Sequence, residues 1–188
     1  MTHIEELTNT RLRQSNSMVA GISSKILQIR KENIKQSLSD LNTIEHRQDY
    51  VATIDGVMYY DDSRAENANA TWFTFENIVR PVIWIAGGND RETDFRDLKH
   101  VAKKKVKALI CIGKHHANLK NAFQKDIKEI YEVKDLEEAV DTASFLAQKD
   151  DIVLFSPACK SDNTKETFVE RGDQFTNIVK QLENECHQ

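Results

Sequence analysis

The sequence predicts an α/β fold in which helices flank a mostly parallel β-sheet, with a helical segment at the N-terminus and a β-hairpin that leads into the sheet. Two observations carry this prediction. Short apolar runs end in turn signals, as residues 152–155 do at Ser156-Pro157, and such runs are typical of strands buried on both faces. These runs alternate with stretches of helical period, which indicates βαβ units and a parallel sheet.

The N-terminal part of the chain predicts two helices. Asn16 or Ser17 can cap the first helix, whose apolar residues recur at helical spacing: Met18, Val19, Ile22, Ile26 and Leu27. The second helix carries Ile29, Ile34, Leu38 and Leu41. The break near residues 29–32 suggests a helix-turn-helix entry rather than one long helix, and the alternative is two helices that simply pack against another element.

A β-hairpin follows in residues 49–60, where two runs of Val, Ile, Thr and Tyr flank Asp55-Gly56. A helix then starts at Asn67 or Asn69. It stops before Pro81, because proline disfavours helical geometry in the residue that precedes it. The apolar residues expected along this helix are Ala70, Phe73, Ile78 and Val79.

The remainder of the chain alternates strands with helices. Strands are predicted at residues 82–86, 108–112, 129–133 and 152–155. Helices are predicted at residues 95–105 with Asp94 as cap, around residues 119–123, at residues 136–148 with Asp135 as cap, and in the final stretch. The final helix carries one apolar face, made of Phe168, Phe175, Ile178, Val179 and Leu182.

Composition excludes several classes of protein. A net charge of −4 argues against a nucleic-acid partner, which would favour a basic face. No stretch approaches the roughly 20 apolar residues of a membrane helix, and no signal peptide is visible. The three cysteines lack metal-ligand spacing, and the adjacent His115 and His116 make a poor ligand pair. We therefore expect a cytoplasmic protein with no membrane partner and no metal site.

Three strand-end loops are candidates for a binding site, because right-handed crossovers bring the loops after parallel strands to one edge of the sheet. They are residues 61–67, 87–94 and 156–164. Gly87-Gly88 either permits a ligand to approach the backbone or simply ends a buried strand. Cys159 is either a nucleophile or a packing residue. Neither the dinucleotide fingerprint nor a P-loop occurs in this chain, and residue chemistry alone names no substrate.

Four stretches, taken together and in order, resemble the Mur ligase family of ATP-dependent amide-bond ligases, and in particular its members that add D-glutamate to UDP-N-acetylmuramoyl-L-alanine. The resemblance covers nearly the whole chain. It rests on NSMVAGI from Asn16, on His46-Arg47 with DDSRAEN from Asp61, on VIWIAGGNDRETDF from Val82, and on SPACKSDNTKETFVERG from Ser156.

The resemblance implies a domain boundary, and it implies which steps of the reaction need the complete enzyme. Residues 1–42 resemble the helical end of the family's central ATPase domain, and residues 43–188 resemble its Rossmann-like C-terminal domain. ATP and magnesium serve the complete enzyme, in which ATP phosphorylates the substrate carboxylate and the D-glutamate amine attacks the acyl phosphate. Without the UDP-binding domain and the P-loop, this chain is expected to hold neither cofactor alone and to carry no catalytic residue.

The resemblance also implies roles for individual residues. Asn16, Arg47 and Asp62 match positions that contact the nucleotide. Arginine binds phosphate in a fork, and aspartate accepts hydrogen bonds from hydroxyl groups. The positions on the amino-acid side are Arg64, Arg91, Ser161 and Phe168.

Several residues depart from the family's pattern. Arg64 and Arg91 replace lysines, and Glu66 replaces a threonine and places a carboxylate near an anionic substrate. Further departures are Leu12, Arg13, Lys160, Asp162 and Lys165. Two hypotheses stay open: the chain is the D-glutamate-positioning part of a ligase, or it is a non-catalytic domain, engineered or degenerate, that keeps the fold and has lost the ligand site.

Overall fold

The computed structural model describes residues 45–163 and 165–186, which all fall within one compact unit, Glu45–Gln188. The helices predicted in residues 1–42, the nucleotide-contact role of Asn16, and the departures at Leu12 and Arg13 lie outside the described residues.

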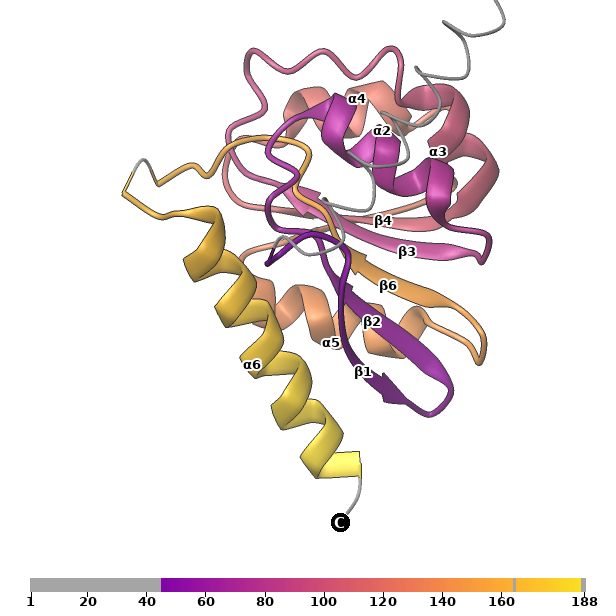
Figure 1. The fold of residues 1–188 in the computed structure, drawn as a ribbon. Coiled ribbons are helices and arrows are strands. Elements are labelled where there is room, and N and C mark those ends of the chain that lie inside the picture. The colour runs from indigo at the N-terminus through magenta and orange to yellow at the C-terminus, as the bar shows by residue number, and fades with distance from the viewer. Residues whose placement is uncertain (1–44, 164, 187–188) are drawn as a thin grey trace, which may run out of the picture. The chain divides into compact units, whose positions relative to one another are not determined.

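The described chain forms one six-stranded sheet with helices on both faces (Figure 1). The sheet order is β1-β2-β6-β3-β4-β5; β1 is antiparallel to β2, and all other neighbouring strands are parallel. This confirms the predicted α/β class and mostly parallel sheet. The strands are β1 (Asp49–Ile54), β2 (Val57–Asp61), β3 (Val82–Gly87), β4 (Val106–Ile112), β5 (Glu129–Val133) and β6 (Ile152–Phe155). The helices are α2 (Ala68–Asn77), α3 (Lys99–Lys105), α4 (Ala117–Phe123), α5 (Leu136–Leu146) and α6 (Phe168–Cys186).

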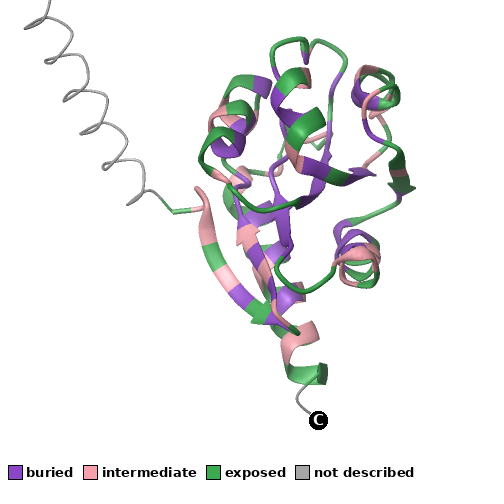
Figure 2. Cartoon of the chain, turned by 90° about the vertical axis from the view of Figure 1, so that its right-hand side faces the viewer, coloured by how far each residue is buried: buried purple, intermediate pink, exposed green. Residues whose placement is uncertain are grey.

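Each face of the sheet has its own hydrophobic core. Helices α2, α3 and α4 cover one face, and α5 and α6 cover the other (Figure 1). Strand β3 supplies both cores, because successive side chains of a strand point to opposite faces: Trp84 lies in the first core, and Ile83 and Ile85 lie in the second. Figure 2 shows the resulting pattern, with buried residues on the sheet and exposed residues on the outer sides of the helices.

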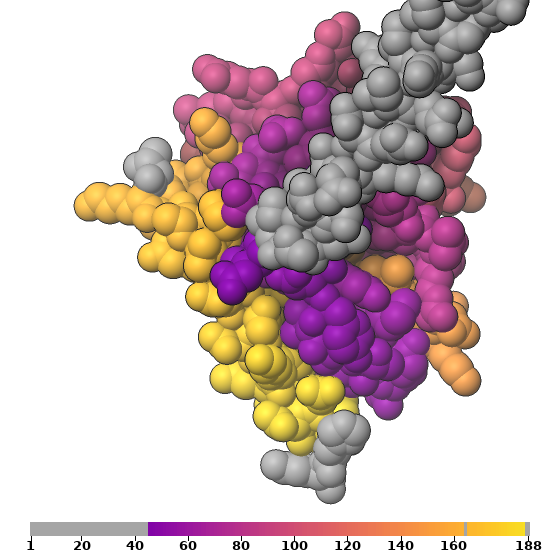
Figure 3. All heavy atoms as spheres, in the orientation of Figure 1, coloured from indigo at the N-terminus to yellow at the C-terminus, as the bar shows by residue number. Residues whose placement is uncertain are grey.

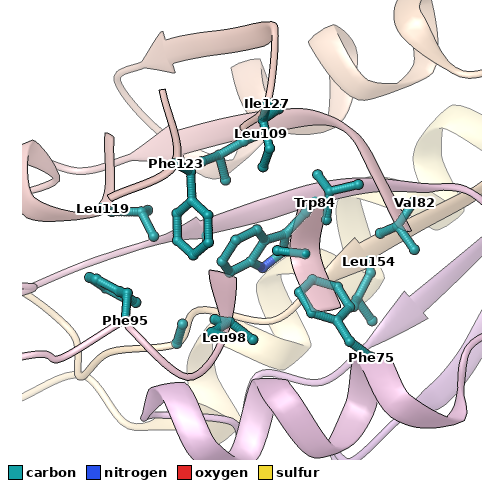
Figure 4. Close-up of a cluster of buried hydrophobic side chains, with 14 of the residues drawn as sticks. Phe75, Val82, Trp84, Phe95, Leu98, Leu109, Leu119, Phe123, Ile127 and Leu154 are labelled. Carbon is teal, nitrogen blue, oxygen red and sulfur yellow. The ribbon is translucent and has the colours of Figure 1, made fainter. Parts of the chain in front are cut away.

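Trp84 is the centre of the first core (Figure 4). Its ring makes edge-to-face contacts with Phe75 of α2, at 5.1 Å between centroids, and with Phe123 of α4, at 5.3 Å. Its indole Nε1 donates a hydrogen bond of 2.7 Å to the Ser156 carbonyl oxygen at the end of β6. Trp84 therefore joins the packing of two helices to the start of the loop that follows β6.

The hairpin turn follows the prediction. Asp55 and Gly56 both have positive φ, at 50° and 81°, which is the backbone of the type I′ turn that Asp-Gly favours between antiparallel strands. Asn67, one of the two residues predicted to start this helix, caps α2 by accepting a hydrogen bond from the Ala70 amide, and the predicted cap Asp135 caps α5 through the Glu138 amide.

Two predicted helices were wrong in detail. Helix α2 ends at Asn77, and its buried residues are Ala68, Thr71, Thr74 and Phe75, so Val79 is 95% exposed rather than packed. Helix α3 starts at Lys99 without a side-chain cap, because residues 95–98 form turns in which Asp94 binds Arg96 instead. In both places the tertiary packing, not the local apolar spacing, decides where the helix begins and which face is buried.

The position of β6 creates a crevice at the carboxyl edge of the sheet. Strand β6 pairs with β2 on one side and with β3 on the other. The chain leaves β2 and β3 towards helices on one face, whereas it leaves β6 towards α6 on the opposite face (Figure 1). Ligands of open α/β sheets bind where neighbouring strands lead to opposite faces. Within the described residues, no helix is both long enough and apolar enough to cross a membrane.

We expect Trp84→Phe to destabilise the domain by roughly 1–3 kcal/mol, because it leaves the buried Ser156 carbonyl without the indole donor and removes ring contacts. Urea unfolding followed by circular dichroism measures this loss. Trp72→Phe is the matched control, since Trp72 is 40% exposed and should shift the unfolding midpoint little. Equal effects of the two substitutions would show that the indole hydrogen bond contributes nothing.

Candidate functional site

Loops from four strands meet at the carboxyl edge, and backbone hydrogen bonds join each of them to a neighbouring loop. The Ala158 amide donates to the Ala65 carbonyl at 2.9 Å, which ties the β6 loop to the β2 loop. The Asn89 amide donates to the Lys160 carbonyl at 2.8 Å, which ties the β3 loop to the β6 loop. In Figure 3 the chain that follows β6, in orange, projects from the surface. The three candidate loops predicted from sequence therefore form one connected rim.

Gly87 and Gly88 serve this joining of loops. Both have strongly positive φ, at 138° and 136°. A Cβ atom would lie 2.2 Å from the Ile112 carbonyl oxygen at Gly87, and 2.3 Å from the Lys160 carbonyl oxygen at Gly88. Only glycine fits both the conformation and the space. The atoms that come close to the two glycines belong to the chain's own backbone. The glycines at positions 87 and 88 are therefore explained without a ligand.

Asp62 is a fully buried carboxylate at the end of β2. Its Oδ2 accepts hydrogen bonds from the Thr74 hydroxyl at 2.7 Å and from the Ser156 hydroxyl at 2.8 Å. Its Oδ1 is buried and has no hydrogen-bond partner among the described residues. Burial raises the pKa of Asp62 to about 7, although the two hydroxyl groups and the charge of Arg47 oppose that shift.

Arg47 lies close enough to Asp62 to act on its pKa. The Arg47 guanidinium lies over the ring of Phe73, with its central carbon 5.7 Å from the centroid. Its Nε is buried and has no hydrogen-bond partner among the described residues. Arg47 therefore keeps a donor, and Asp62 an acceptor, that no described residue uses.

A second buried carboxylate, Asp61, holds the loop that carries Arg64. Its Oδ2 lies 2.6 Å from His46 Nδ1, and its Oδ1 accepts a hydrogen bond from the Ser63 amide at 2.9 Å. Gly172 of α6 packs directly on this pair: a Cβ atom there would lie 2.2 Å from His46 Nδ1 and 2.5 Å from Asp61 Oδ2. The absence of a side chain at Gly172 therefore lets α6 approach the β2 loop.

Two of the predicted amino-acid-side residues meet at the start of α6. The guanidinium of Arg64 lies over the ring of Phe168, at 4.8 Å from its centroid. Nearby, the buried Arg171 donates to the Glu66 carboxylate at 3.0 Å. The carboxylate that Glu66 brings in place of a threonine is thus paired with a cation, which reduces the repulsion expected from sequence.

The other two predicted residues line separate pockets. Arg91 lines a pocket of about 400 Å³ and places a guanidinium nitrogen 2.6 Å from His115 Nε2. Ser161 lines a neighbouring pocket of about 290 Å³, and its hydroxyl donates to the Glu166 carboxylate. The structure therefore places Arg47 near enough to Asp62 to influence its pKa, stacks Arg64 on Phe168, and leaves Arg91 and Ser161 each with its own partner.

Sequence reasoning missed several residues of this edge. Thr71 and Thr74 lie three residues apart on α2, so both face the same side, and their hydroxyls reach Ser156 and Asp62. A pair of threonines at this spacing in a helix that starts beside a strand end is a usable signal. The pairing of Asp162 with His115, at 2.7 Å, joins residues 47 positions apart and has no such local signal.

The alternatives for Cys159 are resolved in favour of packing. The thiol is buried, and burial raises its pKa to about 12, so the thiolate that a nucleophile requires is not formed at neutral pH. Among residues 45–163 and 165–186, no three His, Cys, Asp or Glu side chains cluster as metal ligands would.

The fold and this edge define an α/β domain with a polar site at the switch point of its sheet. A family model described as Mur ligase, glutamate ligase domain, matches residues 46–159. The chain belongs to this family.

Relatives agree with the family match. The chain is 38% identical over 167 residues to UDP-N-acetylmuramoylalanine–D-glutamate ligase of Christiangramia forsetii, covering 89% of this chain and 38% of that protein. It is 39% identical over 168 residues to the enzyme of the same name from Clostridioides difficile, covering 89% of this chain and 37% of that protein. The chain thus spans a little over a third of the length of these relatives.

Solved structures show the same fold at low sequence identity. A ligand-free bifunctional folylpolyglutamate synthase/dihydrofolate synthase from Yersinia pestis gives a TM-score of 0.51 at 16% identity, over 74% of this chain and 32% of that chain. A murein peptide ligase from Psychrobacter arcticus gives 0.50 at 13% identity, over 74% and 29%.

We expect Asp62→Asn to stabilise the domain at pH 8. The native pKa of about 7 lies above the ordinary value, so the native state binds more protons than the unfolded state and stability falls as pH rises from about 4 to about 7. A shift of this size costs roughly 4 kcal/mol above pH 7. Asparagine removes that charge while its oxygen can still accept from Thr74 and Ser156.

Urea unfolding at pH 5 and pH 8 measures this effect, and the advantage of the variant should be larger at pH 8. Asp97→Asn is the control, since Asp97 is exposed and its loss should leave the pH dependence unchanged. An Asp62→Asn variant that is less stable than the natural chain at pH 8 would contradict the buried-charge account.

Proposed function

We propose that this chain is the part of an ATP-dependent ligase that positions D-glutamate for addition to UDP-N-acetylmuramoyl-L-alanine and closes over the nucleotide, in the cytoplasm. The family match supports the ligase class, and the names of the relatives supply the amino acid and its acceptor. In this proposal the domain contributes proximity and charge neutralisation rather than a reacting group.

The observation that carries the proposal is the cationic pocket beside the β3 loop. Arg91 and Lys160 line it together with Asn89, Thr93 and the carboxylates of Glu66 and Glu92, of which Glu66 is paired with Arg171. An arginine fork binds a carboxylate through two parallel hydrogen bonds, and a lysine adds a point charge. A dicarboxylic amino acid matches two cations in one pocket, and Arg64 over Phe168 supplies a third cation at the same edge.

The nucleotide half of the proposal rests on Arg47 and Asp62. Their unpartnered buried Nε and Oδ1 are the donor and acceptor that a phosphate and a ribose hydroxyl require. ATP, when bound to the complete ligase, supplies the phosphoryl group that activates the acceptor's carboxylate. In this proposal Arg47 and Asp62 orient the nucleotide, and magnesium is held outside the residues that the structure describes.

A second candidate function is a non-catalytic domain that keeps the scaffold only. Specific contacts favour it. The Ser161 hydroxyl is already bound to Glu166, the Arg91 guanidinium is already bound to His115, and Glu66 and Glu92 add carboxylates to the cationic pocket. A ligand would have to displace or share these contacts. Binding of D-glutamate by this chain therefore discriminates between the two functions.

We expect D-glutamate, titrated into the ¹⁵N-labelled chain, to shift the amides of Asn89, Arg91 and Lys160 saturably, with L-glutamate binding more weakly. Arg91→Ala should weaken D-glutamate binding roughly tenfold or more, because a hydrogen bond to a charged group is lost. Arg96→Ala is the matched control: Arg96 follows the same strand, but it does not line the pocket and is paired with Asp94. No saturable shift with either isomer would favour the non-catalytic function.

A further inference from the structure

We propose that His115 and Asp162 are positioning residues, which hold the Arg91 guanidinium in one orientation at the mouth of the cationic pocket. Three loops contribute one residue each to this relay: Asp162 follows β6, His115 follows β4 and Arg91 follows β3. The relay itself is a property of the described residues, and its effect on D-glutamate rests on the proposed function.

The chemistry of the three groups fixes the direction of the hydrogen bonds. A guanidinium can only donate, so His115 Nε2, which lies 2.6 Å from the Arg91 nitrogen, must accept. A neutral imidazole that accepts at Nε2 carries its proton on Nδ1. That Nδ1–H faces Asp162 Oδ1 at 2.7 Å and donates to it. The contacts thus select one tautomer of His115.

A carboxylate is the only common side chain of this shape that suits position 162. Its Oδ1 accepts from His115, and its Oδ2 accepts from the Lys114 amide at 3.1 Å, so both atoms face donors. An asparagine would place its NH₂ donor opposite one of these two donors, the His115 Nδ1–H or the Lys114 amide. The hydrogen bonds with His115 and Lys114 also keep the pKa of Asp162 below its ordinary value, although partial burial acts in the opposite direction.

The backbone around the relay is already fixed. The Asp90 amide donates to the His115 carbonyl at 3.3 Å, and the Asp90 carboxylate accepts from the Leu119 amide at 2.7 Å. The Asn118 side chain donates to the Arg91 carbonyl at 3.2 Å. The Arg91 side chain itself is exposed, so without the relay it would sample many rotamers. Holding it in place removes part of the entropy that binding would otherwise cost.

The relay also accounts for the kind of cation at position 91. Arginine has five N–H donors in a rigid fork, so it can donate to His115 through one nitrogen and keep the others for a carboxylate in the pocket. A lysine ammonium is a single point that cannot hold both partners in a planar arrangement. Arg91 and Asp162 are both departures from the family's motif, and His115 joins them, so we treat them as one coupled change.

Three variants of the 188-residue chain test the relay. His115→Gln keeps both ends, because the amide oxygen can accept from Arg91 while the amide nitrogen donates to Asp162. His115→Ala removes the link. Asp162→Asn keeps the shape of the side chain but places the amide NH₂ donor opposite the donor of His115 or of Lys114. His116→Ala is the matched control: His116 is the adjacent histidine, and it contacts the Gly113 carbonyl and Glu132 rather than the relay.

Two readouts need no ligand. The ¹⁵N shifts of the His115 ring should report the Nδ1–H tautomer in the natural chain. The ¹⁵N relaxation of Arg91 Nε should report an ordered side chain in the natural chain, in His115→Gln and in His116→Ala, and a mobile one in His115→Ala and Asp162→Asn. An Nε2–H tautomer, or an Arg91 that is equally mobile in all five proteins, would overturn the relay.

The third readout is the affinity for D-glutamate. We expect His115→Ala and Asp162→Asn to weaken D-glutamate binding roughly two- to tenfold, because binding must then order the Arg91 side chain. We expect His115→Gln to keep most of the natural affinity. Unchanged affinity in both disrupting variants would overturn the positioning role. If the natural chain binds no D-glutamate, the proposed function fails, and the tautomer and relaxation measurements still decide whether the relay exists.

Discussion

The insertion of β6 between β2 and β3 is the constraint on which the site depends. With parallel partners on both sides and a hydrophobic core on each face, β6 is composed entirely of buried apolar residues. Its polar groups can begin only where the strand ends, at Ser156. There the Trp84 indole, the Asp62 carboxylate and the Thr71 hydroxyl all reach Ser156. The last strand in sequence thus organises loops that come from much earlier in the chain.

The site concentrates buried polar atoms in a way that packing alone does not explain. Four buried side-chain atoms have no hydrogen-bond partner among the described residues, and they all lie in or against the β2 loop: Arg47 Nε, Asp62 Oδ1, Ser63 Oγ and Arg171 Nε. Unsatisfied buried groups are costly, so natural proteins keep them rare. Their gathering at one sheet edge agrees with the binding role proposed for Arg47 and Asp62.

Much of the fold followed from local patterns, and the failure at α2 has an identifiable cause. The strands at residues 129–133 and 152–155 were predicted to the residue, the latter from an apolar run that ends in the turn signal Ser156-Pro157. The apolar pattern of α2 was misleading because Thr71 and Thr74 face inward, where their hydroxyls contact Ser156 and Asp62, while Phe73 is only partly buried. Where a buried polar group such as Asp62 lies in the core, the residues that hydrogen-bond to it are polar but face inward. The apolar spacing then no longer marks the buried face of the helix.

The sequence by itself determined the α/β class, the hairpin turn, the helix cap at Asp135 and the likeness to a ligase family, because each depends on residues close together in the chain or on an ordered set of motifs. Only the tertiary structure decided the pairing of Glu66 with Arg171 and the relay from Asp162 through His115 to Arg91. These contacts join side chains from separate loops, and their geometry is set by how the strands are ordered in the sheet, which no local pattern encodes.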